Sequence, residues 1–282
     1  MAGTSLKRQK FLKFFLIYTV IAIALFFTLF PIYWMIKSSI TPDDIMYTPR
    51  PSLFPERITF AHYKALFTET SFMRYFFNSV YVATITMVIS MIISILGSYS
   101  MTRLRFRGRV FIMRSIILSY LLPVAVLFIP MYILMSKIGL NNNKNSLLIV
   151  YLTFTVPYSC YMLISYFRAI PKSLEEAALI DGCTHLQTLI RIILPIASPG
   201  IAVVATFAFT LSWNEYLYAL VLTTSPSQQT VTIGISTFQF SDQYIWGLIM
   251  SSSVISSIPA VTLYLLAQRY LISGLASGGV KQ

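Results

Sequence analysis

The chain has 282 residues, of which 56% are hydrophobic and only 11% charged, and its net charge is +12. A soluble domain carries about a quarter of its residues as charged ones, so this composition argues against an ordinary soluble globular protein. The sequence also lacks a GxxxxGK[ST] loop, and therefore the backbone cradle with which such a loop holds nucleotide phosphates.

Six charge-free apolar stretches predict six transmembrane helices. Each is at least as long as the roughly 20 residues that a helix needs to cross about 30 Å of hydrocarbon. Because the stretches lack the alternation of barrel strands, and the hydrocarbon cannot satisfy an open strand, we expect an all-α integral membrane protein. In chain order the stretches are Phe14–Ile36, Tyr75–Thr102, Ser115–Ser136, Asn145–Phe167, Ile192–Asn214 and Gln243–Gln268.

The first stretch follows several basic residues, as the apolar region of a signal peptide does. It is longer than the usual 7–15 or so residues of such a region and has no small-x-small cleavage site, so we interpret it as a retained span. This predicts a cytoplasmic segment 1–13, a first span with an external segment over 14–70, a membrane core over 71–270 and a cytoplasmic tail over 271–282.

Most basic residues fall in segments that face the cytoplasm if the N-terminus is inside, which predicts that both termini are cytoplasmic. Arg103, Arg105, Arg107 and Arg109 form a basic cluster that nucleic acid could also bind. Between two apolar spans we assign this cluster to topology and to headgroups of the lipid bilayer, and expect no nucleic-acid partner.

The residues that usually build catalytic or metal sites are isolated in this sequence. Cys160 lies in the fourth stretch and Cys183 in a cytoplasmic loop, so they form no disulfide framework and no CxxC site. His62 and His185 are isolated from each other on opposite sides of the membrane, and no paired carboxylates or nucleophile–base pair are evident. We therefore expect no catalytic residue, no metal site and no cofactor in this chain.

The cytoplasmic segment between the fourth and fifth stretches shows two helix starts. Ser173 and Glu176 have the spacing of a capping box that opens a helix at Leu174, and Gly182 supplies its stop. Thr184 and Gln187 form a second start. A helix of about eight residues is too short to be stable alone, so it packs either on a partner or, as an interfacial connector, on the protein itself.

Three of its small or apolar residues, Leu174, Ala177 and Ala178, share one face at helical spacing. The stretch Glu176-Ala177-Ala178, three residues, Gly182, nine residues and Ile192-x-Leu194-Pro195 resembles the EAA motif of binding-protein-dependent ABC importer permeases. Trp213-Asn214-Glu215, Gln268-Arg269 and the ending from Gly274 to Lys281 resemble the smaller permease of maltose-type carbohydrate importers.

The resemblance implies a type I ABC importer permease fold with a cytoplasmic coupling helix, in a bacterial or archaeal cytoplasmic membrane. It implies four kinds of partner: a second homologous permease, two ABC ATPase subunits that hydrolyse the ATP, an external solute-binding protein, and a sugar or oligosaccharide. The residues it assigns to ATPase coupling are Ser173, Glu175, Glu176, Ala177, Ala178, Asp181, Gly182 and Pro195.

Glu215 directly follows the fifth charge-free stretch and is the only ionisable residue that we place within a span; counting from Pro195 places it toward the outer end. It is either an interfacial anchor or, with Trp213 and Asn214, part of the translocation path or outer gate. The polar loop 222–243 is expected to reach the binding protein.

Three other interpretations compete with this one. The solute could be something other than a sugar. A secondary transporter would need more ionisable residues at mid-membrane, together with internal repeats. A membrane-embedded enzyme would need catalytic groups that the sequence does not bring together.

Overall fold

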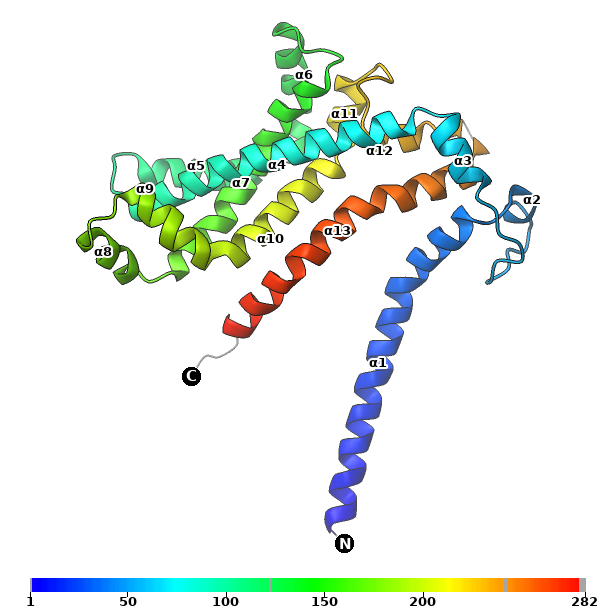
Figure 1. Cartoon of the computed structure of the whole chain (residues 1–282), viewed down its shortest axis with the longest axis horizontal. Coiled ribbons are helices and arrows are strands. Elements are labelled where there is room, and N and C mark those ends of the chain that lie inside the picture. Colours follow the sequence, from blue (N-terminus) through cyan, green and yellow to red (C-terminus); the bar gives the residue numbers. More distant parts are fainter. Residues whose placement is uncertain (1, 122, 241–242, 279–282) are drawn as a thin grey trace. The chain divides into compact units, whose positions relative to one another are not determined.

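A computed structural model describes the protein at residues 2–121, 123–240 and 243–278. The regular secondary structure of these residues is helical apart from one antiparallel hairpin, in which β1 (Gln239–Phe240) pairs with β2 (Gln243–Tyr244) (Figure 1). The all-α prediction is confirmed except for this hairpin. The helical elements are α1 (Ala2–Ser39), α2 (Asp43–Met46), α3 (Ala61–Thr68), α4 (Phe72–Arg103), α5 (Arg109–Leu121), the 3₁₀ turn η1 (Val124–Leu127), α6 (Phe128–Lys137), α7 (Lys144–Ala169), α8 (Ser173–Ile180), α9 (His185–Thr188), the π turn η2 (Leu189–Ile193), α10 (Leu194–Trp213), α11 (Leu217–Leu222), α12 (Val231–Ser236) and α13 (Trp246–Gly278).

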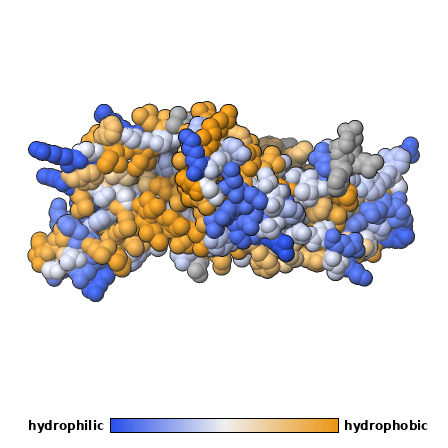
Figure 2. Space-filling view, turned by 90° about the horizontal axis from the view of Figure 1, so that it is seen from above, coloured by the Kyte–Doolittle hydropathy of each residue, from blue (hydrophilic) through white to orange (hydrophobic). Residues whose placement is uncertain are grey.

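Five helical segments of the described chain are long and apolar enough to span a membrane. They are Phe11–Ser39, Phe72–Arg103, Lys144–Ala169, His185–Trp213 and Trp246–Gln268. Broad hydrophobic areas accordingly lie at the molecular surface (Figure 2). Lipid is the solvent that such surfaces need.

The expected third span, Ser115–Ser136, is not one straight helix. Arg109–Leu121 and Val124–Lys137 meet at 95°, with Pro123 at the break, so six spans result only if this bent pair crosses the membrane as one. Proline has no N–H to continue the helical hydrogen bonds and its ring crowds the preceding turn. Pro157 and Pro259, by contrast, lie inside continuous helices.

The described chain divides into two compact units. The first consists of Met1–Thr70 with Phe238–Ile255, and the second of Ser71–Thr237 with Ser256–Gln282. Helix α13 begins in the first unit and ends in the second. The predicted segment boundaries at 13, 70 and 270 stay a prediction.

Small residues let α4 and α7 of the second unit pack closely. Ser90, Ser94 and Ser98 recur at every fourth position of α4 and are fully buried. Ser94 donates to the carbonyl of Val156 and Ser98 to that of Cys160, at 3.3 and 3.2 Å. Short hydroxyl side chains satisfy each other and the facing backbone in this way while the two helices approach one another.

His62 of α3 is packed between other segments of the first unit. His62 is 7% exposed, and its Nε2 lies 2.9 Å from the carbonyl oxygen of Thr41. A Cβ atom on Gly247 would collide with the imidazole ring. His62 is thus a packed structural residue, in agreement with the absence of a histidine cluster in the sequence.

Candidate functional site

The turn after α8 has the geometry that the sequence predicted. Gly182 has a φ of +86°, its N–H donates to the carbonyl of Leu179 at 3.1 Å, and the N–H of Cys183 donates to that of Ala178 at 2.9 Å. This is the Schellman arrangement, which needs a residue in the left-handed region and therefore favours glycine. It ends α8 at Ile180 and turns the chain toward α9.

The predicted capping box at the start of α8 is wrong. The helix begins at Ser173, one residue earlier than expected, and the preceding residue Lys172 makes no side-chain cap. Lys172 already has helical dihedrals, φ −66° and ψ −27°, directly after Pro171. Ser173 therefore lies inside the first turn, where its hydroxyl cannot act as an N-cap.

The second predicted start is confirmed at α9. The Thr184 hydroxyl accepts from the N–H of Gln187 at 3.3 Å, and the Gln187 side chain accepts from the N–H of Thr184 at 2.8 Å. The helix continues through the π turn η2 into α10, where Pro195 occupies the first turn. α9, η2 and α10 thus form the single helical segment His185–Trp213, and the candidate span begins within the motif segment.

A buried arginine fastens α8 to the ends of two other helices. Arg103, the last residue of α4, donates to the carbonyls of Phe167 and Ile170 at the end of α7, at 2.7 and 2.8 Å. Its Nε lies 3.1 Å from Oε1 of Glu175 in α8, as an ion pair rather than an aligned hydrogen bond. The two side chains are only 4% and 10% exposed. One guanidinium therefore connects α4, α7 and α8.

The surroundings of Glu175 raise the pKa of its carboxyl group. Burial raises the pKa of this carboxyl above its ordinary value, although Arg103, His185 and Lys172 each lower it, while Glu176 raises it further. Desolvation disfavours the charged form of an acid, and here it outweighs the nearby cations. Arg103 is thus the largest single favourable contribution to the ionised state of Glu175.

The structure shows which side chains of α8 pack on the protein and which are exposed. Ala178 is 4% exposed and lies with Glu175 on the side that packs on the chain, whereas Ala177 is exposed. Of the three residues that share a face by spacing, Leu174 and Ala177 are thus exposed, whereas Ala178 packs on the protein itself. The free apolar surface of α8 consists of Leu174, Leu179 and Ile180, which are 42%, 38% and 85% exposed.

The other assigned motif residues lie around this surface. Ser173, Glu176, Asp181 and Gly182 are all exposed. At about 100° per residue, Ser173 and Glu176 lie on the same outward side of α8 as Ile180, and Leu174 and Leu179 flank that side. The role of the motif residues in contacting an ATPase stays a prediction.

Glu215 lies between α10 and α11 and is hydrogen-bonded on several sides. Its carboxylate accepts from the hydroxyl of Tyr151 at 2.8 Å and from the N–H groups of Tyr218 and Ala219 at 2.9 and 3.1 Å. These two N–H groups belong to the first turn of α11, where a carboxylate also meets the positive end of the helix. Glu215 thus caps α11 and ties it to α7.

The neighbours of Glu215 have different surroundings. The Trp213 ring is 4% exposed and lies against Phe76 and Phe209, with ring centroids 5.8 and 5.5 Å apart. Asn214 is exposed. The structure therefore places Trp213 in the core of the second unit. A role of the three residues in the path or gate stays a prediction.

We expect Glu215→Gln to lower the free energy of unfolding by about 2 kcal/mol, because an amide cannot accept all three hydrogen bonds and lacks the charge. Unfolding of the purified protein in mixed micelles measures this loss. Asn214→Ala is the control, since its side chain is exposed. If Glu215→Gln kept full stability while transport failed, Glu215 would act in the path rather than as a cap.

The loop 222–243 is fastened along much of its described length. Asn78 of α4 donates to the carbonyls of Ser227 and Gln229 at 3.0 and 2.9 Å, and the Lys144 ammonium donates to Asn78 at 2.7 Å. Residues 241–242 lie outside the described part. The loop is a braced segment here, and its contact with a binding protein stays a prediction.

Comparison with known proteins identifies relatives over nearly the whole chain. Residues 91–277 match a family described as "Binding-protein-dependent transport system inner membrane component". The chain is 35% identical over 266 residues to the inner membrane ABC transporter permease protein YcjP of Escherichia coli (strain K12), covering 94% of this chain and 95% of that protein. It is 34% identical over 265 residues to the diacetylchitobiose uptake system permease protein DasC of Streptomyces coelicolor, covering 93% and 95%. It is 35% identical over 256 residues to the trehalose/maltose transport system permease protein MalG of Thermococcus litoralis, covering 90% and 91%.

A solved structure has the same fold. It is the crystal structure of a bacterial ABC transporter involved in the import of the acidic polysaccharide alginate, which matches with a TM-score of 0.80. The match covers 93% of this chain and 98% of that chain at 23% sequence identity. At this identity the likeness concerns the fold alone.

Proposed function

Because this chain belongs to the family of binding-protein-dependent transport system inner membrane components, we propose that it is a permease subunit of an ATP-driven sugar importer. With a second, homologous permease it forms the path for a sugar or oligosaccharide delivered by an external binding protein. Two separate ATPase subunits hydrolyse the ATP. The names of two relatives, which mention diacetylchitobiose and trehalose/maltose, support a carbohydrate. A non-sugar solute is the second candidate.

The observation that carries the coupling role is the construction of α8. Its outer face exposes apolar side chains, most of all Ile180 at 85%. Its inner face is fixed through Glu175 to Arg103, and so to the ends of α4 and α7. A force applied to the outer face therefore reaches three helices at once. Transport by alternating access needs such a link between a partner and a bistable helical assembly.

We expect Ile180→Glu to abolish ATP-driven uptake, since it replaces the most exposed apolar side chain of α8 with a charge that a contact with the ATPase would have to bury. The measurement is uptake of labelled oligosaccharides into proteoliposomes that contain the chain with its co-assembling subunits, with and without ATP. Ile138→Glu is the matched control, because Ile138 is also an exposed isoleucine, 52% exposed, just beyond α6. Uptake driven by an ion gradient without ATP would contradict the proposal, and uptake of only non-carbohydrate solutes would favour the second candidate.

The proposed orientation has both termini in the cytoplasm. In a Cys160→Ala, Cys183→Ser background, cysteines at Leu53 and Asn142 are expected to react with an impermeant thiol reagent added outside intact cells. Cysteines at Phe106 and Gln187 are expected to react only after the membrane is opened. All four positions have exposed side chains, so accessibility in the protein does not limit labelling. The reverse pattern would invert the topology.

A further inference from the structure

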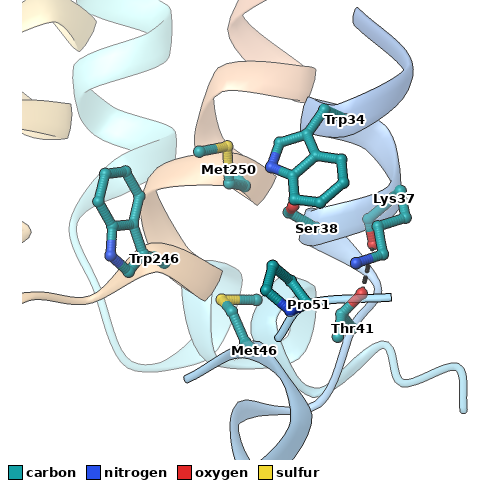
Figure 3. Close-up of a pocket in the computed structure, with 8 residues that line it drawn as sticks. All are labelled: Trp34, Lys37, Ser38, Thr41, Met46, Pro51, Trp246 and Met250. Atoms are coloured by element: carbon teal, nitrogen blue, oxygen red, sulfur yellow. Dashed lines mark hydrogen bonds between the residues drawn. The ribbon is translucent and has the colours of Figure 1, made fainter. Parts of the chain in front are cut away.

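The first unit contains a cavity of about 290 Å³ between the end of α1 and the start of α13 (Figure 3). This volume is close to the lower end of the range for small-molecule sites, about 300–1,000 Å³. Side chains from three parts of the unit line it: Trp34 and Lys37 from α1, Trp246 and Met250 from α13, and Met46 and Pro51 from the segment between α1 and α3.

Lys37 is a largely buried residue whose ammonium has no carboxylate beside it among the residues that the structure describes. The residue is 5% exposed, and its ammonium lies 4.5 Å from the centre of the Trp34 ring. Among the described residues no carboxylate comes within 4.0 Å of this ammonium: in the same unit Asp44 pairs with Arg57, and Asp43 lies 3.8 Å from His62. A buried charge is costly unless it is paired, so the cavity is electrostatically suited to an anionic group.

A second, apolar cavity of about 380 Å³ adjoins the first and shares Trp34 and Met250 with it. Phe30, Pro31 and Ile249 supply much of its remaining lining. Phe30 precedes Lys37 by seven residues, which is about 10 Å along a helix. The two cavities therefore lead from a cation near the end of the candidate span Phe11–Ser39 toward its apolar interior.

We propose that this groove binds an anionic phospholipid, with the lipid phosphate beside Lys37 and an acyl chain along Phe30, Pro31 and Ile249. The location agrees with the interfacial preference of tryptophan and lysine, whose apolar parts face the chains and whose polar groups face the headgroups. A free phosphate would satisfy Lys37 but leave the apolar cavity unfilled. A neutral sugar would leave the ammonium without its anion. The inference does not depend on which solute the protein transports.

Native mass spectrometry of the delipidated full chain tests the proposal. Phosphatidylglycerol, phosphatidylcholine and inorganic phosphate are titrated separately, and the apparent Kd of the first bound molecule is measured. We expect phosphatidylglycerol to bind to the wild type. Lys37→Gln is expected to raise its apparent Kd about tenfold or more, because one charge-assisted contact is lost. Lys64→Gln, which removes an exposed lysine of the same unit, is expected to leave the Kd unchanged.

A second variant keeps the charge and blocks the groove. Met250→Trp places a larger side chain where the two cavities meet, and we expect it to weaken phosphatidylglycerol binding while Lys37 is still present. Equal binding of phosphatidylglycerol by the wild type and both variants would overturn the proposal, as would equally tight binding of phosphatidylcholine. Inorganic phosphate that bound as tightly as the lipid would show a free-anion site instead.

Discussion

Replacing Arg103 with methionine is expected to lower the free energy of unfolding by about 3 kcal/mol, because breaking a buried ion pair leaves the other charge uncompensated. The carbonyls of Phe167 and Ile170 would lose their donor as well. We also expect α8 to detach from α4 and α7, so that ATP hydrolysis no longer drives uptake. Unfolding in mixed micelles and coupled hydrolysis in proteoliposomes measure the two effects.

A double substitution and a pH series identify the cause. Adding Glu175→Leu to Arg103→Met removes the unpaired carboxylate, so we expect it to restore much of the lost stability. The pKa of Glu175 is already raised by burial, and the loss of Arg103 raises it further. A carboxyl with a higher pKa in the folded chain binds its proton more tightly there, so lowering the pH stabilises the folded single variant. The difference from wild type should therefore narrow as the pH is lowered from neutral. A difference independent of pH would contradict this account.

Replacing Gly182 with valine is expected to abolish copurification of the ATPases while membrane insertion continues. The φ of Gly182 is +86°, and no atom lies within 4 Å of a Cβ placed there, so the strain arises from the backbone alone. An L-residue in the left-handed region costs about 1–2 kcal/mol, and a β-branched side chain costs more. This strain acts on the turn that sets the direction of α8 relative to α9.

Gly139→Val is the matched control for this substitution. Gly139 has a φ of +74° and equally open space around its Cβ position, but it follows α6 and lies outside the motif segment. We expect similar backbone strain with normal ATPase association. Gly182→Asn should be milder, because asparagine tolerates the left-handed region. Loss of association in both valine variants would show that general destabilisation, and not the motif turn, is responsible.

Local chemistry in the sequence predicted the parts of the site that depend on neighbouring residues. The positive φ at Gly182 and the box of Thr184 with Gln187 are both decided within a few residues. The box at Ser173 failed for an equally local reason, since the backbone becomes helical at Lys172, directly after Pro171. Apolar stretches likewise predicted the spans, except where Pro123 interrupts one.

Long-range contacts could not be read in the same way. Arg103 was assigned to membrane topology with its basic neighbours, whereas it is buried against Glu175, 72 positions later in the chain. The one available signal was the pair Glu175-Glu176, because consecutive residues of a helix point in directions about 100° apart. Two adjacent carboxylates on a helix that packs on one side can therefore have different surroundings, and one that faces inward needs a cation.

The π turn η2 affects the rotation of the preceding helices α8 and α9 about the axis of α10. Such a turn accommodates one residue more than the α-helix does, and each residue corresponds to about 100° of rotation about the axis. Thr188 and Ile193 are accordingly both fully buried although five positions separate them. Removing one residue here would keep the helix continuous, but it would rotate α8 and α9 by about 100° around the axis of α10. The interval between Gly182 and Ile192 therefore sets an angle as well as a length.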